Sequence, residues 1–314
     1  MLLLLVMWLN HLLFFLSVLL GGLISVAFFI VVERKGLGHF QLRQGPNKPS
    51  IKGIAQALAD GVKLMLKGCF FPGNSEKYLF FLGPFLMFSF SYGFWLIFPC
   101  YHSSIFYESS MAYYMCLVAL GVYGVFICGW SSNSSYALLG AMRALAQSIS
   151  YEVVLGTLIL CPCLYSGGLS VNSFLMTKGL YGGLSVEIFF LWMAVLLAET
   201  NRAPFDFVEG ESELVAGFNV EFGGFGFALI ALAEYGSILF SSVLTGVLFF
   251  GSFFEGILSG VLISVWGVFL SYLFILVRAT FPRFRYDKLM SFSWKGALPL
   301  SLGLLSLSLF EFSF

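Results

Sequence analysis

Residues 2–32 read LLLLVMWLNHLLFFLSVLLGGLISVAFFIVV, and this run decides the class of fold. It is apolar apart from Asn10, His11 and a few small residues. It is longer than the roughly 20 residues that a helix needs to cross a bilayer. It lacks a basic leading region and a small-residue cleavage site, and it is too long for the core of a signal peptide. We therefore interpret it as a retained first membrane span with no Arg- and Ser-rich transit peptide before it.

The composition of the whole chain agrees with a membrane protein. Of the 314 residues, 59% are hydrophobic and 10% are charged, and the mean hydropathy is +0.94. Soluble domains carry about 25% charged residues, because their surface needs polar cover. The formal net charge is zero, so no basic or acidic excess favours nucleic acid as a partner.

Apolar runs recur along the rest of the chain. They are long and continuous, whereas membrane strands alternate in polarity, and helices pair all their backbone polar groups internally. We expect an all-α polytopic membrane protein forming one transmembrane domain over residues 1–314, with about eight spans. The expected spans lie near 3–32, 78–99, 109–130, 144–165, 184–198, 222–245, 254–278 and 292–312.

Positive charges predict the orientation of these spans. Fifteen of the sixteen Lys and Arg residues fall in or beside the loops after spans one, three, five and seven, and only Lys178 falls on the other side. Such a bias marks the inner side of a membrane. The inner loops are then 33–77, 131–143, 199–221 and 279–291, and both termini are expected on the outer side.

The first inner loop contains a pattern of helical spacing. Its apolar members are Ile54, Leu58, Val62 and Met65, and its polar members are Gln56, Asp60, Lys63 and Lys67. Such a pattern predicts an amphipathic helix lying at the membrane interface.

Acidic residues concentrate in one region of this apolar chain. Seven of sixteen fall between 199 and 234, and Glu152 lies inside the fourth expected span. A charge at the middle of a membrane costs at least ~2.5–3.5 kcal/mol, so repeated acids at that depth indicate pairing, protonation or internal water. Pairing of each acid with Arg143, Arg202 or a neighbouring subunit is one interpretation. For Glu152, Glu199 and Glu234 together, we favour a proton relay or conformational coupling.

The segment 202–213 mixes charges with aromatic rings. Glu209, Glu211 and Glu213 share one face if the segment is extended, although a solvated loop explains them equally well. The preceding residues combine Arg202 and Asp206 with Phe205 and Phe207. Such a mixture suits the mouth of a cavity for an amphiphile that has a polar head and an apolar tail. No C-x-x-C pair or clustered histidine predicts a metal site.

Four blocks of this sequence resemble NADH dehydrogenase subunit 1, the quinone-site membrane subunit of respiratory complex I. They are ERKGLGHFQLRQGPN (33–47) with ADGVKL (59–64), GWSSNSSYALLGAMRALAQSISYEV (129–153), AETNRAPFDFVEGESELVAGFNVEF (198–222) and VRATFPRFRYDKLM (277–290). Long, nearly gapless runs of this kind are far more specific than short motifs.

The resemblance implies a non-redox subunit of proton-pumping NADH:ubiquinone oxidoreductase, with eight membrane helices. It has ubiquinone as substrate in a channel shared with two peripheral-arm subunits. The terminal iron–sulfur cluster belongs to a partner subunit. Neighbouring small membrane subunits connect this subunit with the antiporter-like subunits. The implied channel residues are Glu33, Arg34, Arg43, Asp60, Lys63, Arg202, Phe205, Asp206, Glu209, Glu211, Glu213, Arg278 and Arg283. The implied proton path uses Arg143, Glu152, Glu199, Glu221 and Glu234.

The shortness of the chain, its 38 Phe residues and the missing presequence favour a mitochondrially encoded protein of the inner membrane. The basic loops would then face the matrix, both termini would face the intermembrane space, and membrane lipids would surround the spans. Two alternatives remain at this point. One is the related membrane subunit of a hydrogenase-type complex, and the other is a stand-alone proton-coupled transporter.

Overall fold

The computed structural model describes residues 2–98, 108–176, 186–206, 217–250 and 257–313, and among these it describes the side chains of all but 2–12, 176, 257–259 and 312–313. The described residues form helices and connecting loops, with no strand among them. The main helices are α1 (Leu2–Phe40), α2 (Gln56–Leu66), α3 (Lys77–Gly93), α4 (Ser110–Ser131), α5 (Ser135–Ser166), α6 (Val171–Met176), α8 (Val186–Glu199), α10 (Gly224–Thr245), α11 (Ile257–Thr280), α12 (Tyr286–Ser291) and α13 (Leu298–Ser313).

Short turns of other helix types extend or connect these helices. Turns of 3₁₀ helix are η1 (Ile51–Gly53), η2 (Phe94–Ile97) and η3 (Gly217–Asn219), and π-type turns are η4 (Gly246–Phe250) and η5 (Phe292–Ala297). Both π-type turns continue long helices, η4 at the end of α10 and η5 at the start of α13.

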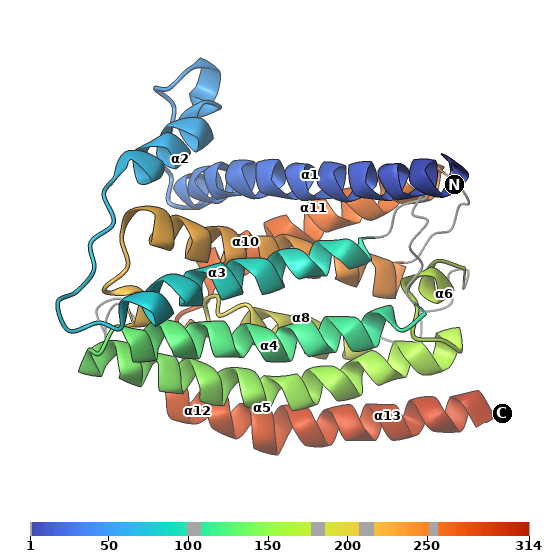
Figure 1. Cartoon of the computed structure of the whole chain (residues 1–314). Coiled ribbons are helices and arrows are strands. Elements are labelled where there is room, and N and C mark those ends of the chain that lie inside the picture. Colours follow the sequence, from blue (N-terminus) through green and yellow to red (C-terminus); the bar gives the residue numbers. More distant parts are fainter. Residues whose placement is uncertain (1, 99–107, 177–185, 207–216, 251–256, 314) are drawn as a thin grey trace.

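The long helices run side by side as one bundle, and α2 projects from one end of it (Figure 1). Both chain ends lie at the opposite end of the bundle, on different sides of it. Helices α3, α4 and α5 pack in sequence order, α10 contacts both α3 and α11, and α13 lies against α5. The buried hydrophobic core between α5, α8 and α10 includes Tyr151, Leu155, Trp192, Leu196 and Ile238.

Glycines allow α3, α4 and α5 to approach closely. A Cβ atom at Gly83 on α3 would lie 2.6 Å from Cys128 Sγ on α4, and one at Gly124 would lie 2.6 Å from Met87 Cγ. A Cβ atom at Gly129 would lie 2.3 Å from Ala141 Cβ on α5. Small residues at helix crossings are typical of membrane bundles, where van der Waals packing drives association.

The protein is an all-helical polytopic membrane protein. Six stretches of the described chain are long and apolar enough to cross a membrane: Leu13–Phe40, Lys77–Ile97, Ser110–Ser131, Ser135–Ser166, Gly224–Phe250 and Gly260–Thr280. Helix α8 has 14 described residues, and α13 has 16. At about 1.5 Å per residue, α8 by itself falls short of the roughly 30 Å hydrocarbon core, whereas η5 extends α13 at its start. The total of about eight spans stays a prediction.

Two of the expected loop boundaries are wrong. Residues 135–143 belong to α5, so the expected loop 131–143 shrinks to the short connection between α4 and α5. The helix begins early because Ala137 and Ala141 are fully buried one turn apart against α4. Helix α1 likewise continues through the charged residues 33–35 to Phe40, since Glu33 and Arg34 find partners on other elements.

The predicted amphipathic helix is confirmed as α2. None of its residues is buried, and Leu58, Val62 and Met65 are 72%, 56% and 69% exposed. The half-buried Asp60 instead pairs with Arg34 on α1. Gln56 and Asp60 therefore turn toward the bundle, and Leu58, Val62 and Met65 turn away from it. That arrangement suits a helix lying at a membrane interface.

Candidate functional site

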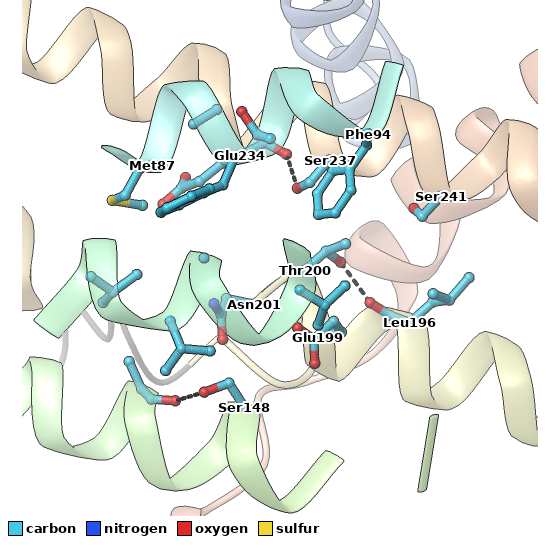
Figure 2. Close-up of a pocket in the computed structure, with 18 of the residues that line it drawn as sticks. Met87, Phe94, Ser148, Leu196, Glu199, Thr200, Asn201, Glu234, Ser237 and Ser241 are labelled. Carbon is cyan, nitrogen blue, oxygen red and sulfur yellow. Dashed lines mark hydrogen bonds between the residues drawn. The ribbon is translucent and has the colours of Figure 1, made fainter. Parts of the chain in front are cut away.

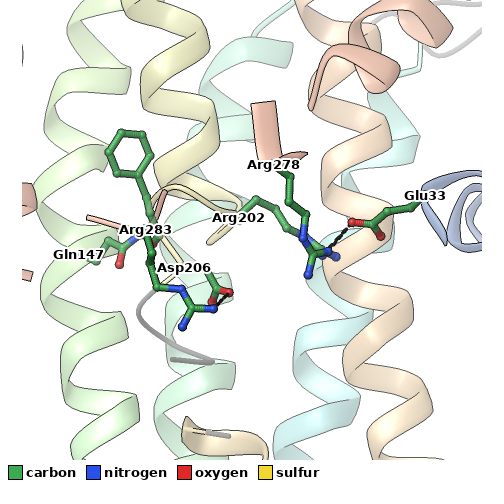
Figure 3. Close-up of polar contacts among 7 residues, drawn as sticks. Glu33, Gln147, Arg202, Asp206, Arg278 and Arg283 are labelled. Carbon is green, nitrogen blue, oxygen red and sulfur yellow. Dashed lines mark hydrogen bonds and ion pairs between the residues drawn. The ribbon is translucent and has the colours of Figure 1, made fainter. Parts of the chain in front are cut away.

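A buried ion-pair cluster joins α1, α11 and the chain that follows α8. Arg278 on α11 donates a hydrogen bond to Glu33 Oε1 on α1. Arg202 Nη1 lies 3.5 Å from the same oxygen, and the side chains of Glu33 and Arg202 are only 7% and 12% exposed. Figure 3 shows the two guanidinium groups converging on Glu33. One carboxylate thus holds two cations from distant parts of the sequence.

Tyr235 on α10 completes this cluster. The Arg202 guanidinium carbon lies 4.2 Å from the centre of the Tyr235 ring, which is a close cation–π contact. Burial by itself lowers the pKa of Arg202, but Tyr235, Glu33 and Glu234 outweigh it and raise that pKa above its ordinary value. Arg202 therefore stays protonated and is a fixed positive charge at this position.

Residues 199–206, which we call the strap, lead from the end of α8 to the last residue described before η3. At their far end, Arg283 Nη2 lies 3.2 Å from Asp206 Oδ2. The Phe205 ring stacks on Phe284, with 5.6 Å between centroids. The Phe284 amide also donates to Pro204 O at 3.0 Å. The strap is thus attached to the segment that connects α11 with α12.

Next to the strap lies a cavity of about 120 Å³. Its polar lining includes Glu199, Thr200, Asn201, Glu234, Ser148 and Ser237, and apolar side chains such as Phe94 and Leu196 contribute the rest of the wall. Figure 2 shows Glu199 on one wall and Glu234 on the facing wall. Glu199 Oε2 and Asn201 Oδ1 are buried without a hydrogen-bond partner in the described chain. Internal water satisfies such atoms where space allows, and each water needs about 10–15 Å³.

The other residues expected along a proton path lie around this cavity. Glu152 on α5 does not line it, yet it is close enough to Glu199 for the two carboxylates to repel each other. Arg143 lies on α5, with its guanidinium carbon 5.9 Å from the centre of the Tyr286 ring. Glu221 is partly exposed, precedes the first turn of α10 and does not line the cavity. Of the expected acids, only Glu199 and Glu234 share this cavity.

The expected residues of the first inner loop lie on and beside α2. Arg34 Nη1 lies 2.6 Å from Asp60 Oδ2, and Gln56 Nε2 donates to Asp60 Oδ1 at 2.6 Å. Lys63 is exposed. Arg43 is also exposed, and its Nε donates to Gln41 Oε1 at 2.8 Å. The charges of this loop therefore form a separate, wetter group than the buried cluster at Glu33.

Three expected channel residues, Glu209, Glu211 and Glu213, lie outside the described residues. Two residues that the sequence analysis missed belong to the site, Tyr235 beside Arg202 and Gln147 beside the strap. Gln147 follows Arg143 by four residues and precedes Tyr151 by four, so a polar stripe on an otherwise apolar helix was the available signal. Among the described residues, no group of three His, Cys, Asp or Glu side chains could hold a metal ion.

The fold and the site together define a class of protein. It is a polytopic helical membrane protein with a polar, acid-containing cavity between its helices and a buried cluster of arginine ion pairs beside it. A family model described as NADH dehydrogenase matches residues 13–309.

Three known proteins of similar sequence are each named NADH-ubiquinone oxidoreductase chain 1. The protein from Pecten maximus is 46% identical over 298 residues, which cover 91% of this chain and 84% of the relative. The one from Heterololigo bleekeri is 47% identical over 288 residues, covering 90% and 91%. The one from Lampetra fluviatilis is 44% identical over 292 residues, covering 91% of each. The chain belongs to the NADH dehydrogenase family, among the chain 1 proteins.

Proposed function

We propose that this chain is a core membrane subunit of NADH:ubiquinone oxidoreductase that walls the ubiquinone channel and couples quinone reduction to proton translocation. The redox centres belong to partner subunits, and ubiquinone is the substrate of the shared channel. The names of the relatives support this function over a hydrogenase-type subunit or a stand-alone transporter.

One observation carries the coupling role. Glu199 and Glu234 face the same small cavity, where each charge costs at least ~2.5–3.5 kcal/mol if it lies at mid-membrane depth. The fixed charge of Arg202 lies nearby and interacts with Glu234. A cavity of this size holds internal water, and water between carboxylates allows protons to move. Ionisable groups are expensive to bury in a membrane, and those that occur there mark functional sites such as proton relays.

The proposed coupling is electrostatic. Reduction of a quinone in place creates negative charge, and negative charge favours protonation of nearby carboxylates. In this proposal, Arg202, Arg278 and Glu33 respond first, because they form one buried network next to the strap. The strap then leads to Glu199, and Glu152 and Glu234 continue the path, with Arg143 beside it and Glu221 at its edge. The exposed Arg34, the half-buried Asp60 and α2 would guide the quinone head at the channel mouth.

The proposal includes the surroundings of the chain. We assign it to the mitochondrial inner membrane, with the basic loops in the matrix and both termini in the intermembrane space. Its partners would be the peripheral-arm quinone-site subunits, the subunit that holds the terminal cluster, neighbouring small membrane subunits and lipids. Both chain ends lie at one end of the bundle, which supports an even number of crossings (Figure 1).

The test is the Glu199→Gln substitution in the assembled complex. This change keeps the size of the side chain and removes its ability to carry negative charge. We expect proton translocation per electron to fall by at least about half, while NADH oxidation by a water-soluble artificial acceptor stays normal. Glu187→Gln is the matched control, because Glu187 is exposed at the other end of the same helix. Unchanged translocation per electron in the Glu199→Gln complex would remove Glu199 from the path.

A further inference from the structure

The side chain of Gln147 is completely buried in the middle of α5. Its Nε2 donates two hydrogen bonds, to Ala198 O at 2.8 Å and to Phe205 O at 3.0 Å. A side-chain amide has two N–H donors, so both bonds are made at once. The two carbonyl oxygens also fix the orientation of the amide, because its own oxygen would repel them. Gln147 Oε1 is left buried without a partner among the described residues.

These two carbonyls lie at opposite ends of the strap. Ala198 immediately precedes Glu199, and Phe205 immediately precedes Asp206. A single amide on α5 therefore holds both ends of the segment that presents Glu199 to the cavity and Arg202 to Glu33. Figure 3 shows Gln147 on the side of the strap opposite to the Glu33 cluster.

The strap turns sharply at Asn201. The φ of Asn201 is 50°, in the left-handed region that few residues other than glycine and asparagine adopt. A conformation of this kind persists only where surrounding contacts hold it. Inside the strap, the Arg202 amide donates to Leu197 O at 3.1 Å, and the Phe205 amide donates to Arg202 O at 2.8 Å. These bonds shape the turn, but they do not attach it to another helix.

We propose that Gln147 is a positioning residue for quinone reduction, which sets the placement of Glu199 and Arg202 by holding the two ends of the strap. The inference rests on the proposed function and adds a residue that itself touches neither the Glu33 cluster nor the main cavity. Without the amide, both ends of the strap lose their bond to α5. Arg202 then shifts relative to Glu33, and Glu199 shifts relative to Glu234.

The substitution Gln147→Glu tests the two-donor bond directly. A protonated carboxyl donates one hydrogen and keeps one of the two bonds, whereas an ionised carboxyl repels both carbonyl oxygens. We expect the KM for a short-chain ubiquinone analogue to exceed that of the wild-type complex, with the ratio growing as pH rises from 6 to 9. Loss of one hydrogen bond predicts a ratio of roughly two- to tenfold. The wild-type and variant complexes share the other charged groups around the strap: Glu199, Arg202, Asp206, Arg283, Arg143 and Glu152. Titration of these groups changes both KM values, so it cancels in the ratio of the variant KM to the wild-type KM.

Two further variants complete the series. Gln147→Leu removes both bonds. We expect its KM to exceed the wild-type KM by a ratio that does not change with pH. Ser150→Ala is the control, since Ser150 is also buried, lies one turn further along α5, and within the described chain donates to Gln147 O and Met290 Sδ. We expect the control to match the wild type. In every case, NADH oxidation by a water-soluble artificial acceptor measures electron input through the partner subunits, and the amount of this chain in the purified complex measures assembly.

The outcomes separate this inference from the proposed function. Arg202→Lys is assayed beside the Gln147 variants. If Arg202→Lys raises the KM while both Gln147 variants keep wild-type values, the positioning role is rejected and the proposed function stands. If none of the three changes the KM, the proposed channel wall itself is rejected. Failure of both Gln147 variants to assemble would assign the residue to folding and would also reject the positioning role.

Discussion

At the scale of single residues, Glu33 organises the buried charges of this protein. Its carboxylate accepts from Arg278 and lies 3.5 Å from Arg202. The two cations differ in their surroundings, because the Arg202 side chain is 12% exposed and that of Arg278 is 36% exposed. Water can replace the partner of a half-exposed charge, but it reaches a buried one poorly. The two arginines should therefore contribute unequally to stability.

We predict that Arg202→Met destabilises the chain more than Arg278→Met. Breaking a buried pair by removing one partner costs about 3–5 kcal/mol, and loss of a solvent-accessible pair costs about 0–1 kcal/mol. The free energy of unfolding can be measured in the membrane-embedded complex by brief proteolysis across a urea series. Equal losses for the two variants would contradict the unequal roles inferred from their exposure.

At the scale of elements, α2 and the loop before it contain two glycines with very different surroundings. Gly53 has a φ of 76°, and a Cβ atom there would lie 2.2 Å from Pro46 O. No other residue type fits this turn without displacing the loop. Gly61 lies within α2, and a Cβ atom there would meet nothing within 4 Å. The same substitution should therefore act in opposite directions at the two positions.

We predict that Gly53→Ala loosens this segment and that Gly61→Ala stabilises it. Alanine in a helix interior is favoured over glycine by about 1 kcal/mol, whereas a left-handed backbone costs an alanine roughly 1–2 kcal/mol before any clash. The rate of trypsin cleavage after the exposed Lys63 and Lys67 reports the opening of α2. Cleavage should be faster than in the wild type for Gly53→Ala and slower for Gly61→Ala. The same rate for both variants would show that α2 opens independently of its glycines.

At the scale of the whole molecule, the bundle has two different ends. One end carries α2 and the loop that contains Cys69, and the other carries the connection between α5 and α6 (Figure 1). Cys69 is exposed, and Leu169 in that connection is 42% exposed. Positive charges gather toward the first end, so the proposed orientation puts Cys69 on the matrix side.

We predict that a membrane-impermeant maleimide labels these two positions from opposite sides of the membrane. The comparison uses one variant that retains only Cys69 and another in which Leu169→Cys supplies the only cysteine. Mitoplasts should label the second variant, and inverted vesicles stripped of the peripheral arm should label the first. Labelling of both variants from the same side would overturn the proposed topology, whatever the number of spans.

The sequence by itself determined the helical membrane fold, because long apolar runs have few other stable states in a bilayer. It also determined the amphipathic α2, whose pattern is local. It named Glu33, Arg202 and Arg278 through a family resemblance, but it did not reveal that they meet. Only the tertiary structure decided that contact, since Glu33 and Arg278 lie 245 positions apart. The tertiary structure also decided the early start of α5 and the bonds from Gln147 to both ends of the strap. Such pairings depend on how helices pack, and close packing is set by shape along whole helices rather than by any local pattern.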